Sequence, residues 1–195
     1  MKKELILVNK SDQVVGYQEK MKTHKDRLLH RAFSLFIYSQ NDKKFLLQKR
    51  SISKYHSGGK WSNSCCSHPY KSETWCDSLN RAVSDELNMS LEINRGIKCD
   101  SNLCPKYIDK RLFYAGSFIY SSDFEEISEN ELDYVFVYLA DSVIPDIHVN
   151  PLEVSELIWL KIDEIEKWLK QSPDAFSSWF EKAFALVKDN LGNLL

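Results

Sequence analysis

Alternating and continuous apolar runs along the chain predict a series of short strands. The most apolar run is 32–38, and a polar turn separates it from 45–49, which we expect to be its hairpin partner. The full set of predicted strands is 4–8, 14–17, 32–38, 45–49, 112–120, 132–140 and 157–160. Between them, 18–27 and 50–60 are polar and basic, which indicates connecting segments.

Helical periodicity is clearest over 75–87, where apolar residues recur every three or four positions. Two further helices are predicted at 163–171 and 175–190. Strands and helices intermix, so the fold class is α/β or α+β. The chain shows no internal repeat or linker, and we expect a single domain over 1–195.

Composition restricts the possible partners and location. The 195 residues are 43% hydrophobic and 28% charged, with a formal charge of −2, which argues against a nucleic-acid-binding protein but permits a local basic pocket. No apolar run reaches the roughly 20 residues that cross a bilayer, so we expect no membrane insertion and a cytoplasmic location. Five cysteines, two of them adjacent, are expected to be free thiols.

The nine residues 61–69, WSNSCCSHP, concentrate the candidate chemistry. In an extended chain, Cys66 and His68 share one face while Cys65 faces the other. The alternative is a pair of buried cysteines that behave as small apolar residues. A zinc site made of Cys65, Cys66, His68 and Cys76 also competes, although the paired C-x-x-C spacing is missing.

Glu86 lies near the middle of the apolar face of the helix predicted at 75–87. A buried carboxylate there needs a partner. One possibility is a salt bridge, but Arg81 is better placed to pair with Asp85, four residues along the helix. We favour the other possibility, a ligand for a hard cation such as Mg²⁺.

Glu129 and Glu131 share a face if they belong to the strand that follows, and such a pair needs a cation or a shared proton. The alternative is an acidic, solvated loop that includes Glu125 and Glu126. With His24, His30 and His68 they would form a site suited to Zn²⁺, Mn²⁺ or Mg²⁺, but spacing alone equally permits separate histidines. His56 and His148 lie in polar stretches with no comparable pattern. By default, Lys20, Arg50 and Lys54 are solvated cations and Trp179 is a core aromatic.

Taken together, these segments resemble the type I isopentenyl-diphosphate isomerase family, a branch of the Nudix fold. The resemblance extends from about Lys20 to Trp179 and rests on His24 with 30–34, 61–69, 129–131 and 175–179, in family order. It implies a mixed β-sheet sandwiched between helices.

The segment 67–89 also resembles a degenerate Nudix box, matched at Glu73, Arg81, Val83, Asp85, Glu86 and Met89. Ser67 and Asn88 replace its glycines, and Ala82 replaces a glutamate. These departures weaken the alternative function, a Nudix hydrolase of a nucleoside diphosphate derivative.

The resemblance implies an isomerase of isoprenoid biosynthesis that interconverts isopentenyl and dimethylallyl diphosphate. One divalent metal, Mn²⁺, Zn²⁺ or Mg²⁺, would be coordinated by His24, His30, His68, Glu129 and Glu131. A Mg²⁺ that arrives with the substrate diphosphate would be held by Glu86 and the backbone carbonyl of Cys66. The diphosphate itself would contact Lys20, Arg50, Lys54 and Ser67.

The residue types suit this chemistry. Protonation of an alkene needs a positioned acid, for which the candidate is Glu131 with Tyr120 nearby. The resulting tertiary carbocation would be stabilised by the indole face of Trp179. Cys66, on the opposite face of the substrate, would exchange the other proton at C2. The remaining cysteines, Cys65, Cys76, Cys99 and Cys104, are expected to pack in the core, and we expect a monomer, with a dimer as the alternative.

Overall fold

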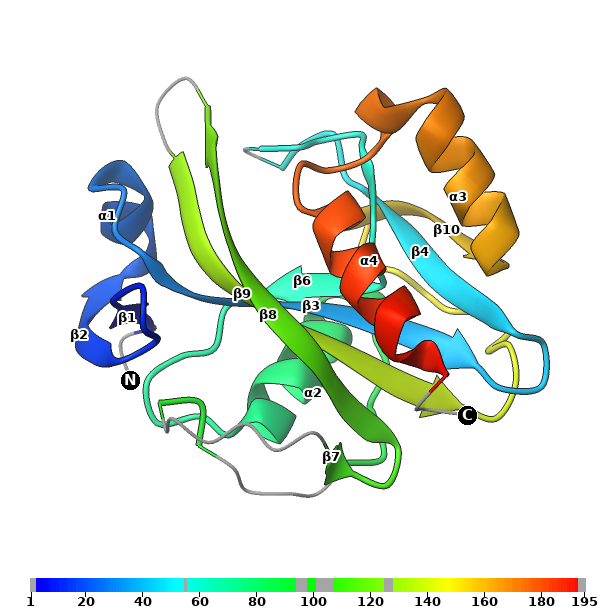
Figure 1. The fold of residues 1–195 in the computed structure, drawn as a ribbon, viewed down its shortest axis with the longest axis horizontal. Helices are drawn as coiled ribbons and strands as arrows, with labels where there is room; N and C mark the ends of the chain where they lie inside the picture. Colours follow the sequence, from blue (N-terminus) through cyan, green and yellow to red (C-terminus); the bar gives the residue numbers. More distant parts are fainter. Residues whose placement is uncertain (1–2, 55, 94–97, 101–106, 125–127, 193–195) are drawn as a thin grey trace.

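The computed structural model describes residues 3–54, 56–93, 98–100, 107–124 and 128–192. Its strands form one mixed sheet whose central path runs β10-β4-β3-β9-β8-β7 (Figure 1). The strands are β1 (Glu4–Val8), β2 (Val14–Glu19), β3 (His30–Ser39), β4 (Lys44–Arg50), β5 (Trp61–Ser62), β6 (Cys65–Ser67), β7 (Tyr107–Asp109), β8 (Leu112–Asp123), β9 (Ser128–Ala140) and β10 (Val154–Leu160). The helices are α1 (Lys20–Lys25), α2 (Trp75–Leu87), α3 (Ile162–Gln171), the 3₁₀ turn η1 (Pro173–Ala175) and α4 (Phe180–Leu191).

Strand β3 is the centre of the sheet. It pairs in parallel with β9 along its whole length, from His30 opposite Glu131 to Ser39 opposite Ala140. On its other edge it changes partner, pairing first with β1, then with β6 and finally with β4. All ten of its residues are buried, which explains the continuous apolar run in the sequence. The first half of β3 is therefore flanked on this edge by the short strands β1 and β6 and not by one long strand.

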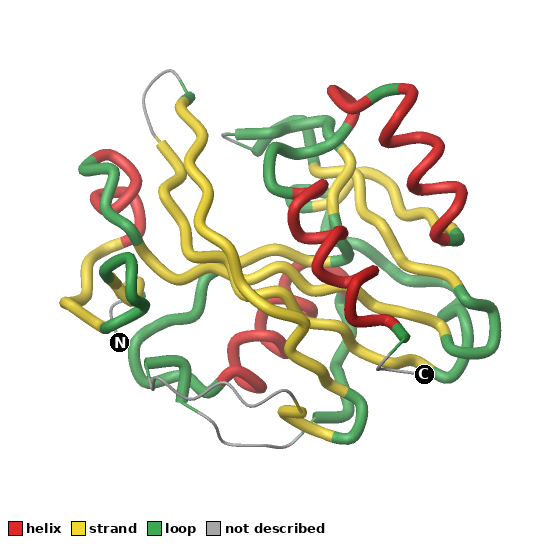
Figure 2. Tube along the Cα trace, in the orientation of Figure 1, coloured by secondary structure: helices red, strands yellow, loops and turns green. Residues whose placement is uncertain are grey.

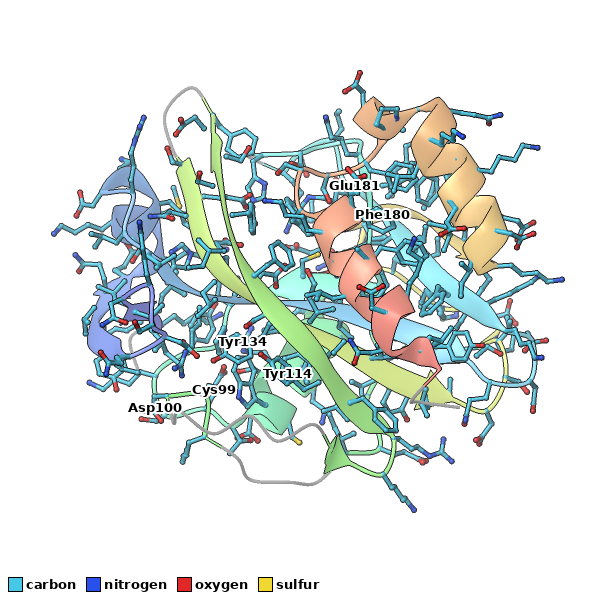
Figure 3. All side chains as sticks on the ribbon, in the orientation of Figure 1. Cys99, Asp100, Tyr114, Tyr134, Phe180 and Glu181 are labelled. Carbon is cyan, nitrogen blue, oxygen red and sulfur yellow. The ribbon has the colours of Figure 1, made fainter. Side chains whose placement is uncertain are left out.

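Helices cover both faces of this sheet (Figures 1 and 2). On one face, α2 packs its Trp75 against Tyr134 and Phe136, at ring-centroid distances of 4.6 and 5.0 Å. On the other face, Phe180 and Phe184 of α4 pack against Phe36. Figure 3 shows Tyr114 and Tyr134 close together near α2, and Phe180 on α4. The predicted class, a mixed sheet sandwiched between helices, is confirmed.

The prediction for 75–87 is confirmed at both ends. Thr74 and Asp77 form a capping box at the N-terminus of α2, and Asn88 ends the helix in the left-handed conformation at φ 49°. The apolar stripe of this helix faces the sheet, and it carries Glu86 with it into the interior.

Two predicted segments differ from the structure. The polar connection over 18–27 is wrong, because it contains the end of β2 and helix α1, whose first amides bond to the Glu19 carboxylate. The last helix begins at Phe180 and not at 175. The amide of Ser177 donates to the carbonyl of Trp61 and Phe176 pairs with Trp61, so these two residues run beside β5 and separate the turn η1 from α4.

The strand bounds also decide one open alternative. Strand β9 begins at Ser128, so Glu129 and Glu131 lie inside a buried strand and not in a solvated acidic loop. Glu125 and Glu126 lie outside the described residues. Among the described residues, no helix has the length and apolar character that crossing a membrane requires.

Candidate active site

A cavity of about 220 Å³ opens beside the start of β3. Its walls come from β6, β9, α2, the loop after β4 and the segment before α4. Most of the residues singled out in the sequence line it, although they are scattered from 20 to 179. These residues are Lys20, Arg50, Lys54, Cys66, Ser67, His68, Glu86, Tyr120, Glu129, Glu131 and Trp179.

Three imidazoles and one carboxylate converge beside this cavity, and two members of the group, His68 and Glu131, line it. His24, His30 and His68 have ring centroids 4.9 to 5.3 Å apart. Glu131 Oε1 lies 2.7 Å from His68 Nε2 and 3.5 Å from His30 Nε2. All four residues are buried, and one potential ligand atom from each lies within 4.8 Å of the others. The group therefore has the spacing and donor types of a site for a divalent metal ion.

Backbone contacts orient the histidines inward. His30 Nδ1 lies 2.8 Å from the Leu28 carbonyl, and His24 Nδ1 lies 3.3 Å from the Ser128 carbonyl. Burial lowers the pKa of His24 to about 4 and that of His68 well below its usual value. These side chains are therefore neutral near pH 7, which is the protonation state that coordinates metal.

Glu129, the fifth predicted ligand, lies beside this group but is not part of it. Its Oε1 is 2.8 Å from His56 Nε2, and its Oε2 accepts a hydrogen bond from Tyr120 at 3.1 Å. The same hydroxyl, which has a single hydrogen to donate, lies 2.5 Å from Glu131 Oε2, the shorter of its two contacts. Burial and the neighbouring Glu131 raise the pKa of Glu129 well above its usual value. His56, which showed no pattern in the sequence, is buried in the site.

A third acid shares this face of β9. Asp133 is 2% exposed, lines the cavity and accepts a hydrogen bond from Ser34 at 2.7 Å. Burial and the charge of Glu131 raise its pKa well above the usual value. Sequence reasoning missed Asp133, although strand alternation from Glu131 places it on the same face.

The stretch 61–69 divides as an extended chain predicts. Cys66 and His68 line the cavity, whereas Cys65 is fully buried in the core on the side of α2. The metal-ligand group formed by the described residues contains no cysteine, which disfavours the Cys/His zinc alternative. Cys65, Cys66, Cys76 and Cys99 are free thiols, and Cys104 lies outside the described residues.

Asn63 connects two candidate catalytic side chains and was also missed. Its Oδ1 accepts hydrogen bonds from the Cys66 thiol and from Trp179 Nε1, both at 3.1 Å. Its Nδ2 donates to the carbonyls of Leu35 and Cys65. The side chain is fully buried, and this one amide fixes the thiol relative to the indole. An amide so close to Cys66 in sequence was the available clue.

Trp179 is a wall of the cavity, with only 2% of its surface exposed. The Arg50 guanidinium lies over its ring at 5.3 Å, and the Tyr120 ring centroid is 6.0 Å away. Lys20 and Lys54 line the same cavity, and burial together with the charge of Lys54 lowers the pKa of Lys20. This crowding of cations suits an anionic ligand.

Two acidic residues lie close to these cations. Lys54 forms an ion pair with Glu153, another residue that sequence reasoning missed. Glu86 is 6% exposed and accepts a hydrogen bond from Gln48 at 2.9 Å, and burial raises its pKa. Within the described part of the chain, Glu86 has no ion pair, which disfavours the salt-bridge alternative.

The predicted pairing of Arg81 with Asp85 is wrong. Arg81 Nε donates to Glu73 at 2.8 Å, and its Nη2 donates to the His68 carbonyl at the same distance. Glu73 lies just before α2, and its two carboxylate oxygens accept hydrogen bonds from Nε and Nη2 of the guanidinium group. The backbone amide of Tyr70 also donates to this carboxylate. Arg81 therefore anchors the segment that carries His68.

Comparison with known proteins gives one consistent result. The NUDIX domain model matches residues 28–180. The isopentenyl-diphosphate Delta-isomerase of Aliivibrio fischeri (strain MJ11) is 36% identical, covering 98% of both chains. The protein of that name from Burkholderia multivorans is 34% identical, covering 92% of this chain and 90% of the relative. A crystal structure from Deinococcus radiodurans shares the fold, with a TM-score of 0.62 at 17% identity, covering 95% of this chain and 98% of that one.

Replacement of Asn63 by alanine should destabilise the protein by about 3 kcal/mol, because it leaves buried donors and acceptors without partners. The free energy of unfolding in urea measures this loss. Asn130→Ala is the matched control, since that amide makes one bond, to the Arg27 carbonyl, at the surface. Equal losses in the two variants would contradict the role given to Asn63.

The Cys66 thiol should react slowly with iodoacetamide at pH 8. Burial raises its pKa to about 12, so the folded protein holds less thiolate than the unfolded chain at this pH. We expect alkylation at pH 8 to be at least about tenfold slower than in urea, and the native rate to keep rising above pH 10. Mass spectrometry of the peptide containing Cys66 follows the reaction, and a native rate that levels off near pH 8.5 would show an ordinary thiol.

Proposed function

The chain belongs to the Nudix superfamily, among the isopentenyl-diphosphate Delta-isomerases, and from this membership we propose that it interconverts isopentenyl and dimethylallyl diphosphate. The observation that supports this reaction best is the set of groups around one cavity. A thiol, a tyrosine-bonded carboxylate and an indole face the same space, next to a cluster of cations. Each step of an allylic proton shift has a matching side chain there.

The cations would bind the diphosphate. Lys20, Arg50 and Lys54 line the cavity, and so does Ser67 at the end of β6. Glu86, on the adjoining face of α2, is placed to help hold a Mg²⁺ that accompanies the diphosphate, together with the carbonyl of Cys66. The proposed ligand is therefore a small allylic or homoallylic diphosphate.

The resident divalent metal would be held by His24, His30, His68 and Glu131, with Glu129 beside them. Three imidazoles and carboxylate oxygen suit Zn²⁺, Mn²⁺ or Mg²⁺. When bound, such an ion supplies positive charge that holds the Glu131 carboxyl group and tunes its acidity.

The proton shift uses the two sides of the cavity. In the protonated form, Glu131, hydrogen-bonded to Tyr120, would deliver its proton to C4 of isopentenyl diphosphate and become a carboxylate, which breaks the C3–C4 π bond and leaves a tertiary cation at C3. The face of Trp179 would stabilise this cation. Cys66, as the thiolate, would then accept the proton from C2 and become a thiol while the C2–C3 double bond forms, and the reverse reaction starts from this thiol and carboxylate.

The alternative function, hydrolysis of a nucleoside diphosphate derivative, has less support. Ala82 stands in the wall of the cavity where the Nudix box has a glutamate, so the acidic set for hydrolysis is incomplete. A hydrolase also has no use for the thiol of Cys66, which Asn63 holds at the cavity surface.

With isopentenyl diphosphate and Mg²⁺, the wild-type protein should form dimethylallyl diphosphate. Cys66→Ser should lose at least about a thousandfold in kcat, because a hydroxyl is a far weaker acid than a thiol and forms almost none of the anion that accepts the proton. Chromatography of the dephosphorylated alcohols measures the product. Cys76→Ser, on the core side of α2, is the control and should keep its activity. Phosphate release without the allylic isomer would refute the isomerase proposal.

Replacement of Glu153 by glutamine should tighten the binding of diphosphate, because Lys54 then no longer has an internal counter-ion. We expect the dissociation constant of inorganic pyrophosphate to fall about two- to fivefold, the effect of one partly exposed ion pair. Calorimetric titration measures it. Glu156→Gln, which removes a surface pair with Lys49, should leave the constant unchanged. Weaker binding to Glu153→Gln would contradict the competition.

A further inference from the structure

His56 lies in the loop after β4, where the sequence indicated only a polar connection. Its side chain is nevertheless 7% exposed and lines the cavity. Its ring lies between two aromatic residues, with centroids 5.2 Å from Phe124 and 5.8 Å from Trp179. A polar ring that is buried in this way requires a polar partner, and His56 has a carboxylate within hydrogen-bond distance.

That carboxylate belongs to Glu129. His56 Nε2 lies 2.8 Å from Glu129 Oε1, while Tyr120 donates to Glu129 Oε2 at 3.1 Å. The phenol has a single hydrogen to donate and lies closer to Glu131 Oε2, at 2.5 Å. The shorter contact to Glu129 is therefore the one from His56, and this contact restrains the position of the carboxylate.

This orientation has a consequence for metal binding. Glu129 lies two residues before Glu131 on the same face of β9, so it approaches the group of His24, His30, His68 and Glu131 from one side. An unrestrained carboxylate would be repelled by Glu131 in the absence of an ion. A restrained carboxylate is already in place when the ion arrives, so less conformational entropy is lost on binding.

We propose that His56 is a positioning residue of the metal site, which holds Glu129 by a hydrogen bond from Nε2–H to Oε1 and keeps this carboxylate beside the His24–His30–His68–Glu131 group. The proposal rests on the metal site of the proposed function but does not depend on which reaction the site performs. Partners that orient a ligand in this way typically contribute 10- to 100-fold to metal affinity.

The main chain of the same residue has a separate contact. Arg50 Nη2 lies 3.4 Å from the carbonyl oxygen of His56, so this loop also supports a cation assigned to the diphosphate. Substitution of the side chain leaves the carbonyl in place. The same Nη2 also lies 3.5 Å from His56 Nε2, so loss of the side chain removes one contact of Arg50 and keeps the contact to the carbonyl. We therefore expect changes at His56 to weaken metal binding much more than the binding of pyrophosphate.

The test compares two substitutions by Mn²⁺ binding to the full chain without substrate, followed by electron paramagnetic resonance of the free ion. His56→Ala should raise the dissociation constant about 10- to 100-fold, whereas His56→Gln, which keeps an N–H donor at similar reach, should recover most of the affinity. His148→Ala is the matched histidine control and should bind as wild type. Glu131→Gln, which alters the central group itself, should lose binding most strongly.

Thermal unfolding in a chelator tests that the metal-free variants remain folded, and pyrophosphate titration tests that the cation cluster is intact. Wild-type Mn²⁺ affinity in His56→Ala would overturn the proposal, and so would an equal loss in His56→Ala and His56→Gln. If the wild-type protein binds Mn²⁺ as expected but fails to isomerise isopentenyl diphosphate, the proposed function fails while the role of His56 stands.

Discussion

The register between three neighbouring strands is the constraint on which the candidate active site depends. His30 of β3 and Tyr120 of β8 lie opposite Glu131 of β9, on either side of it. This row places an imidazole, a carboxylate and a phenol in line on one face of the sheet. A slip by one residue would turn Glu131 to the other face and separate the three groups. The long parallel pairing of β3 with β9, buried on both faces, makes such a slip costly.

The same register creates an electrostatic problem. Strand alternation brings Glu129, Glu131 and Asp133 to one buried face, where three negative charges repel one another and are poorly solvated. The structure distributes the surrounding donors so that each acid has a different environment. Glu131 faces the imidazoles, Glu129 lies between His56 and Tyr120, and Asp133 accepts from Ser34. Three acids of similar chemistry can therefore take different roles within one cavity.

A second organising contact lies across the cavity from these acids. The Asn63 amide accepts hydrogen bonds from both Cys66 and Trp179, so it fixes the position of the thiol relative to the indole. Because Ser177 is bonded to Trp61, the segment that carries Trp179 is tied to the same stretch of chain. This tie also delays the start of the last helix to Phe180, which helical periodicity alone could not show. In this way a local departure from regular structure positions a side chain for function.

Local sequence patterns by themselves determined the helix α2, most strands and the division of Cys65 from Cys66, because each follows from the period of side chains along one element. Motif resemblance added the expected metal, thiol and indole positions. The roles of His56, Asn63 and Glu153 depended on the tertiary structure, since each acts through a partner on another segment, and Asp133 acquired its partner Ser34 only there. Periodicity predicts which face of an element a residue occupies. The residue that it contacts across that face is determined by the packing of segments that are distant in sequence, and in this chain such packing forms the candidate active site.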